Sequence, residues 1–100
     1  MIVESVGFKV APGNRSQARE WGAKMMEYSK KLPGQHLLLQ PITGDNMEMV
    51  LVVRCASLSE YEEARNKRMS DPEWAPITKE GQESDWYLGH RRNLYEALIE

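Results

Sequence analysis

The sequence predicts a small α+β domain in which strands and helices follow the order βαββαβ. Two patterns predict it. Some stretches place apolar residues at every second position, which is typical of strands, and others space them three and four positions apart, which is typical of helices. The chain has 100 residues, so we expect residues 1–100 to form a single domain around one core.

Composition argues against several classes of function. Apolar residues make up 41% of the chain and charged residues 28%, an ordinary globular balance. With 13 basic and 15 acidic residues the net charge is -2, so no nucleic-acid partner is expected. Basic pairs and clusters at 30–31 and 65–68 are expected at helix C-terminal ends, where cations complement the helix dipole.

The chain also lacks the usual signals for membranes and secretion. No apolar run approaches the ~20 residues of a membrane span, and the first ten residues do not resemble a signal peptide. We therefore expect a cytoplasmic protein with no membrane partner. The single cysteine, Cys55, follows a strand-like run and precedes a helix start, which is typical of a buried structural thiol.

The first half of the chain reads as strand, helix and strand. Residues 2–10 alternate, with Glu4 as the one polar member of a face that otherwise carries Ile2, Val6, Phe8 and Val10. Asn14 and Gln17 have the spacing of a capping box. They predict a helix of about 15 residues, ended by "LPG", whose apolar side carries Ala18, Trp21, Met25, Tyr28 and Leu32.

The second half continues the order. "QHLLLQPI" and "MEMVLVVRC" predict two strands joined by a turn at "TGDN" (43–46), and the second, being the more continuously apolar, should lie centrally. Ser57 and Glu60 form another capping-box spacing, opening a helix that buries Leu58, Tyr61 and Ala64. In "DPEW", Asp71 is the expected N-cap, Pro72 the first helical residue and Trp74 the anchor.

The last strand is expected in "SDWYLGHRRNL", and the six residues that follow it could extend it or form a short helix. This order is the ferredoxin-like one, usually an antiparallel sheet with strand order 4-1-3-2 and helices on one face. Val3, Val50 and Val52 would then lie on the uncovered face. Such a patch usually marks an interface, so we expect a face-to-face homodimer; a monomer is the alternative if the strand phase is reversed.

Three short stretches, "LPG" (32–34), "SLSEYEEAR" (57–65) and "DPEW" (71–74), are similar to NIPSNAP-like proteins. Over nearly its whole length the chain resembles the dimeric α+β barrel superfamily, which includes antibiotic-biosynthesis-monooxygenase-like proteins. Haem-degrading members of that superfamily usually hold iron through a histidine on the second helix, and residues 58–69 contain none. The resemblance therefore implies no haem. Without a Cys-x-x-Cys or His-x-x-x-His motif, neither a metal nor a cofactor is expected.

Charged residues converge if the first and last strands are antiparallel neighbours. An attractive register pairs Val10 with Trp86, Phe8 with Leu88, Val6 with His90, and Glu4 with Arg92. It predicts a catalytic group in which His90 is a general base, Glu4 orients it and Arg92 stabilises an anion. The alternative is an interior ion pair between Glu4 and Arg92 without chemistry.

Aromatic and sulfur-containing side chains would form the opposite wall of this site. Such groups bind flat apolar ligands well, and the substrate-binding candidates are Trp21, Met25, Tyr61, Trp74 and Trp86. The alternative is that they are core residues, and for Trp74 we expect helix anchoring to come before ligand contact.

These residues support two main hypotheses of function. One is a small homodimer that binds an apolar or aromatic molecule and acts as a cofactor-independent monooxygenase-like or isomerase-like enzyme. The other is a non-catalytic dimeric structural or interaction module of NIPSNAP-like type. A third is a protein-interaction subunit that uses the tail "LYEALIE". The residues alone do not decide whether the protein is an enzyme.

Overall fold

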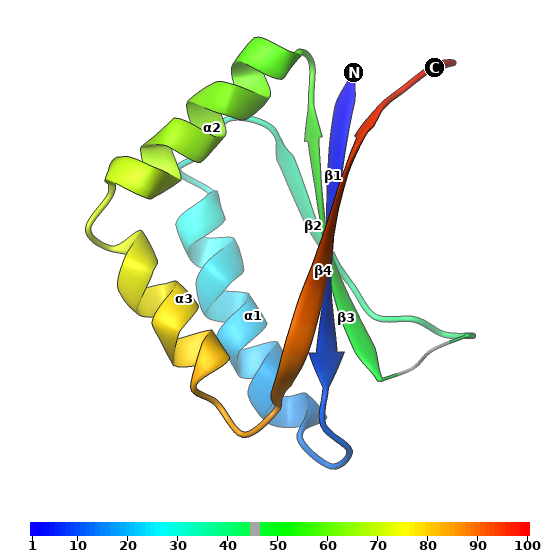
Figure 1. Cartoon of the computed structure of the whole chain (residues 1–100), viewed down its shortest axis with the longest axis vertical. Coiled ribbons are helices and arrows are strands. Elements are labelled where there is room, and N and C mark those ends of the chain that lie inside the picture. Colours follow the sequence, from blue (N-terminus) through cyan, green and yellow to red (C-terminus); the bar gives the residue numbers. More distant parts are fainter. Residues whose placement is uncertain (45–46) are drawn as a thin grey trace.

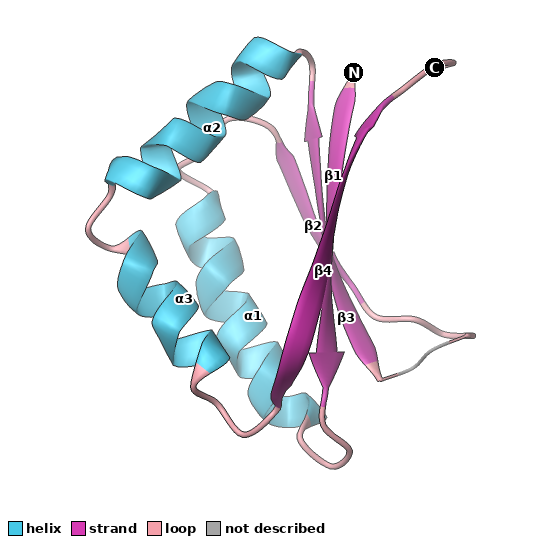
Figure 2. Cartoon of the chain, in the orientation of Figure 1, coloured by secondary structure: helices cyan, strands magenta, loops and turns pink. Residues whose placement is uncertain are grey.

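A computed structural model describes residues 1–44 and 47–100. Its elements follow the order β1 (Ile2–Val10), α1 (Arg15–Ser29), β2 (Gln35–Leu39), β3 (Glu48–Cys55), α2 (Leu58–Ser70), α3 (Trp74–Gln82) and β4 (Tyr87–Glu96) (Figure 1). The four strands are antiparallel neighbours in the order β2-β3-β1-β4. All three helices cover one face of the sheet (Figure 2). The α+β, ferredoxin-like prediction is confirmed; the turn expected at 43–46 lies partly outside the described residues.

The start of α2 has the side-chain cap predicted from the sequence, whereas the start of α1 does not. At α2, Ser57 Oγ accepts the Glu60 backbone N–H at 3.2 Å, and the Glu60 carboxylate accepts the Ala56 N–H at 3.3 Å. At α1, Asn14 occupies the N-cap position but its side chain caps no backbone group. Its amide instead donates to Gln17 Oε1 at 3.4 Å, so the capping box predicted there is wrong.

The core lies between the helices and the face of the sheet predicted to be buried. Val6, Phe8 and Val10 of β1 point into it beside Glu4, which is 1% exposed. From β3 it receives Met49, Leu51, Val53 and Cys55. Cys55 is a free, buried thiol whose pKa is raised by its burial. The predicted strand phase is therefore confirmed.

The pairing of β1 with β4 differs from the predicted register by two residues. Phe8 pairs with His90, Val6 with Arg92, and Glu4 with Leu94. Alternation cannot detect such an error, because a shift of two residues leaves every side chain on the same face. The predicted register paired residues of similar type across β1 and β4, and similarity of type does not fix how two strands align.

The pairing of β1 with β4 also contains an irregularity, because its register shifts between Phe8 and Val10. Val10 pairs with Tyr87 although Phe8 pairs with His90, so Leu88 and Gly89 together lie opposite Lys9. This is the geometry of a β-bulge, and Gly89 takes a φ of 124°, which favours glycine. Leu88, expected opposite Phe8 on the buried face, is 60% exposed.

The "DPEW" stretch joins α2 to α3 and ties both to α1. Helix α3 begins at Trp74 with Glu73 at its N-cap position, so the prediction that Asp71 is the N-cap and Pro72 the first helical residue is wrong. Asp71 Oδ1 accepts the Glu73 N–H at 2.9 Å and its Oδ2 accepts the Tyr28 hydroxyl at 2.9 Å. The ring of Trp74 lies 5.0 Å from that of Tyr28. Asp71 thus caps the turn before the helix, and Trp74 anchors α3 on α1.

None of the helices that the structure describes lies over the second face of the sheet (Figure 1). Register places Leu37 beside Val52, Leu39 beside Val50, and Tyr95 beside Val3 on this outer face. Leu37, Leu39 and Tyr95 are 38%, 47% and 53% exposed. The uncovered apolar patch is therefore larger than the three valines predicted.

The chain ends meet at one end of the sheet (Figure 1). Strand β4 runs to Glu96, and the Ala97 N–H donates to the Met1 carbonyl at 2.9 Å. The first part of the tail therefore extends the strand. In the described part of the chain, no helix has both the length and the apolar character needed to cross a membrane.

Candidate functional site

A cavity of about 160 Å³ lies between the three helices and the β1–β4 side of the sheet. One part of its lining is aromatic or sulfur-containing, contributed by Phe8, Trp21, Met25, Met69, Trp74, Trp86 and Tyr87. The other part is polar or charged, contributed by Glu4, Arg68, Thr78, Gln82, His90 and Arg92. The cavity therefore combines apolar walls with a small group of charges, as ligand sites commonly do.

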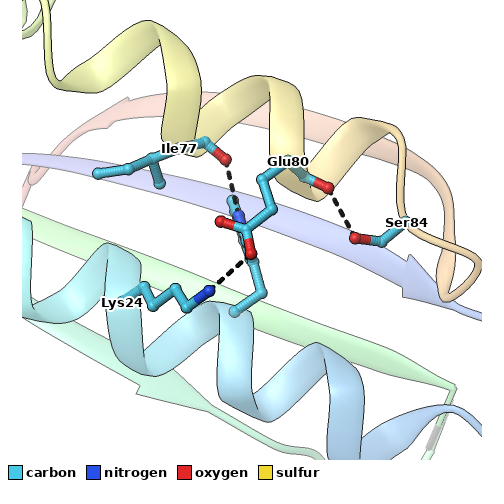
Figure 3. A network of polar contacts seen from close by, with 5 residues as sticks. Lys24, Ile77, Glu80 and Ser84 are labelled. Atoms are coloured by element: carbon cyan, nitrogen blue, oxygen red, sulfur yellow. Dashed lines mark hydrogen bonds and ion pairs between the residues drawn. The ribbon is translucent and has the colours of Figure 1, made fainter.

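Polar contacts join α3 to α1 (Figure 3), and the packing of these two helices holds the aromatic wall in place. The Trp21 indole N–H donates to the Ile77 carbonyl at 2.8 Å, and Lys24 pairs with Glu80 at 2.6 Å. The Trp21 ring lies 5.3 Å from the ring of Trp86. A Cβ at Gly81 would lie only 2.6 Å from Trp21, so the close approach of α3 requires glycine there.

Glu4 forms the buried charged end of the cavity. The Tyr61 hydroxyl donates to Glu4 Oε2 at 2.5 Å, and Arg92 Nε lies 3.4 Å from the same oxygen. Glu4 Oε1 is buried and has no hydrogen-bond partner in the described chain. Burial, followed by the bond to Glu4, raises the pKa of Tyr61. The predicted Glu4–Arg92 pair exists, but the Arg92 side chain is 52% exposed, so the pair lies only partly in the interior.

His90 lies at the exposed rim of the cavity. Its Nδ1 is 2.6 Å from the Tyr87 hydroxyl oxygen, whereas the partners of Glu4 are Tyr61 and Arg92. The expectation that Glu4 orients His90 is therefore wrong, and Tyr87 takes that role. When Nδ1–H donates to Tyr87, the lone pair of Nε2 is free to accept a proton.

Arg68 is the main lining residue that sequence reasoning missed. Its side chain is 7% exposed, and its guanidinium lies 5.6 Å from the centre of the Trp74 ring. The sequence analysis places it with its basic neighbours at a helix C-terminal end, where it would complement the helix dipole. Its spacing could have placed it correctly, because position 68 lies four and seven residues after Ala64 and Tyr61 on the buried side of the helix.

Most of the predicted site residues share the cavity. Glu4, His90 and Arg92 line it, as do four of the five substrate-binding candidates: Trp21, Met25, Trp74 and Trp86. Tyr61 is absent from the lining and instead supports Glu4 through its hydroxyl. Besides Arg68, the missed residues include Phe8, Met69, Thr78 and Tyr87.

A second cavity, of about 200 Å³, lies between the start of α1 and the ends of β2 and β3. Its charged lining residues are Arg15, Arg19 and Glu48. The unpartnered buried side-chain atoms of the described chain belong to Glu4, His36 and Trp86, and none of these lines it. The first cavity is therefore the stronger candidate. No group of three or more His, Cys, Asp or Glu residues placed to hold a metal ion occurs among the described residues.

The sequence matches no protein-family profile and no curated protein. Its structure is similar to a NIPSNAP domain protein from Burkholderia xenovorans (TM-score 0.80, 12% identity, 97% of this chain and 94% of that one). It is similar to a NIPSNAP family protein of unknown function from Agrobacterium tumefaciens (TM-score 0.77, 18% identity, 95% of this chain and 86% of that one). It is also similar to SnoaB, a cofactor-independent oxygenase from Streptomyces nogalater (TM-score 0.73, 17% identity, 99% of this chain and 94% of that one).

These similarities cover nearly the whole of each chain at low identity, so what they establish is the fold. The structural neighbours include both predicted groups: NIPSNAP-family proteins, which the three short stretches resemble, and antibiotic-biosynthesis-monooxygenase-like proteins, which the chain resembles over nearly its whole length. The chain has the ferredoxin-like α+β fold that these two groups of proteins share.

Proposed function

We propose that this protein is a homodimer that binds a small planar aromatic molecule in the cavity between its helices and its sheet. The observation that carries the proposal is that all three tryptophans of the chain line one cavity that also contains the buried Glu4 carboxylate. Aromatic walls favour flat ligands through stacking. The charged groups at one end would fix the orientation of the ligand.

Filling the cavity tests this proposal. Thr78 lines it from α3, so Thr78→Phe should occupy the ligand's space, whereas Lys79→Phe on the exposed side of the same helix should not. We expect wild type and the Lys79 variant to bind planar aromatics, detected by calorimetry and by tryptophan fluorescence, and the Thr78 variant to lose binding. Equal binding by both variants, or none by wild type, would contradict the proposal.

The dimer half of the proposal rests on the outer face of the sheet. Leu37, Leu39, Val50 and Val52 form a continuous apolar patch across β2 and β3, and none of the helices in residues 1–44 and 47–100 covers it. Patches of this kind mark protein interfaces. A second copy related by a two-fold axis covers the same patch on both chains at once.

A catalytic role for His90 is the second part of the proposal, favoured by the Tyr87 contact that fixes its ring. In the tautomer whose Nδ1–H donates to Tyr87, Nε2 can take a proton from an acidic C–H of the ligand. The carbanion is then reprotonated at another carbon, which is an isomerisation, or reacts with molecular oxygen, which is an oxygenation. A base at the cavity rim can pass its proton to solvent.

His90→Gln separates binding from this chemistry. We expect the variant to bind aromatic ligands as wild type does, but to lose exchange of the acidic ligand proton for deuterium, measured by NMR in D₂O. Undiminished exchange in the variant would remove His90 as the base. Absence of exchange in wild type with every ligand that binds would favour the non-catalytic alternative.

A further inference from the structure

The cavity holds a buried positive charge that the chain does not neutralise. The Arg68 side chain is 7% exposed and lines the cavity. In the described part of the chain its guanidinium makes no hydrogen bond or ion pair, and it lies over the Trp74 ring at 5.6 Å from the ring centre. Buried charges are ordinarily paired, because desolvating a charge without a partner is costly. The Arg68 nitrogens are not among the fully buried unpartnered atoms, so the guanidinium N–H groups are open to the cavity, where an anion can pair with them.

Glu4 does not supply that anion. Its Oε2 is already held by the Tyr61 hydroxyl and Arg92 Nε, and no ion pair joins it to Arg68. The acidic and basic lining residues include Glu4, Arg68 and Arg92, and these three together give the cavity one positive charge in excess. Both guanidiniums lower the pKa of Tyr61, which shows that they act on the same region of the site.

The geometry points to a small planar aromatic carboxylate as the ligand, with its rings among Trp21, Trp74 and Trp86 and its carboxylate on the Arg68 guanidinium. The planar guanidinium can give a carboxylate two parallel N–H···O bonds. Its contact with the Trp74 ring leaves the N–H edge of the group available for such a pair. This inference rests on the proposed function and adds the chemical class of the ligand.

The test compares each carboxylate with its neutral amide. Benzoate and benzamide, and 2-naphthoate and 2-naphthamide, differ in charge but little in shape. Calorimetry would give their dissociation constants with wild type, Arg68→Gln and Arg65→Gln; Arg65 is exposed on the same helix and is the matched control. Circular dichroism would confirm that each variant is folded.

We expect wild type and the Arg65 variant to prefer the carboxylate over the amide by about 10-fold to 100-fold. Arg68→Gln should lose this preference while its affinity for the amide changes little. Arg68→Lys keeps the charge but loses the paired donors, so an intermediate preference is expected. The preference of wild type is measurable even if the Arg68→Gln variant does not fold.

Two outcomes overturn this inference and leave the proposed function standing. One is equal binding of carboxylate and amide by wild type. The other is an undiminished preference in a folded Arg68→Gln variant, which would place the anion elsewhere. If wild type binds neither member of either pair, while a different neutral aromatic does bind and is lost in Thr78→Phe, only the carboxylate class fails. If no aromatic binds at all, the proposed function fails too.

Discussion

Glu4 occupies a position on β1 that alternation assigns to an apolar side chain. The sequence marked it as the polar exception on that face, and the structure shows why it is tolerated: a hydroxyl and a guanidinium both reach Oε2. The contact from Tyr61 crosses from α2 to β1 and is fully buried. The Glu4–Tyr61 hydrogen bond should therefore contribute more to stability than the Glu4–Arg92 pair, whose arginine is half exposed.

Tyr61→Phe tests this contribution. Removing the hydroxyl leaves the buried Glu4 carboxylate without its shortest donor, so the free energy of unfolding should fall by about 1–3 kcal/mol. Chemical denaturation measures it, and a double-mutant cycle with Glu4→Leu, which removes the acceptor, isolates the pair. An equal loss on replacing Tyr61 in the Glu4→Leu background would show that the hydrogen bond is not responsible.

His36, half-buried on β2, is a second polar residue with a buried atom. Its Nε2 is buried without a partner, and desolvation, with a smaller effect of the Arg68 charge, lowers the pKa of its imidazole below the usual 6.5. The unfolded chain therefore binds a proton at a higher pH than the folded chain. This contribution to stability is complete above pH 6.5 and is lost as the pH falls from there through the folded pKa.

We accordingly expect wild type to lose more stability than His36→Gln between pH 7.5 and pH 5. The carboxylates titrate in both proteins and cancel in the comparison. Urea denaturation at a series of pH values measures the difference. Parallel stability curves for the two proteins would show that His36 is not protonated preferentially in the unfolded state.

At the scale of elements, the sequence predicted which segments form strands and helices far better than how two strands align. Alternation assigned Val6 and Phe8 to the buried face correctly, but could not choose between registers two residues apart. A glycine inside a strand often marks a bulge, so Gly89 was the available signal. Arg68 was missed because its cluster of basic neighbours suggested a helix C-terminal end, where cations complement the dipole, although its spacing placed it on the buried face.

Helix α3 is the element on which the cavity wall most depends. Gly81→Ala would place a methyl group against the Trp21 ring, so α3 must move away from α1. We expect a loss of about 1–3 kcal/mol in the free energy of unfolding from this overpacking, reduced by the better helix propensity of alanine.

Lys79→Ala, on the exposed side of the same helix, is the control for this substitution and should change stability by no more than about 0.5 kcal/mol. Denaturant unfolding followed by tryptophan emission would measure both variants. A Gly81→Ala variant as stable as wild type, with unchanged emission, would show that α3 accommodates the methyl group without moving.

For the whole molecule, we expect the apolar patch on the outer face of the sheet to determine the oligomeric state. Val52 lies inside the apolar patch, paired on either side with Leu37 and Ser5. Val52→Lys should place a charge in the proposed interface and convert a dimer to monomers, whereas Glu62→Lys, exposed on α2, should not. Sedimentation velocity distinguishes the species. A monomeric wild type, or a dimeric Val52 variant, would contradict the face-to-face arrangement.

Ligand binding in the tryptophan-lined cavity is tested most directly by an NMR titration of the three tryptophan indole N–H signals with 2-naphthoate and with a neutral planar aromatic. We predict that the signals of Trp74 and Trp86 shift and saturate at one ligand per chain, while amide signals from Leu37, Val50 and Val52 do not move. Indole signals that stay unchanged at millimolar concentrations of both ligands, or shifts confined to the outer face of the sheet, would contradict it.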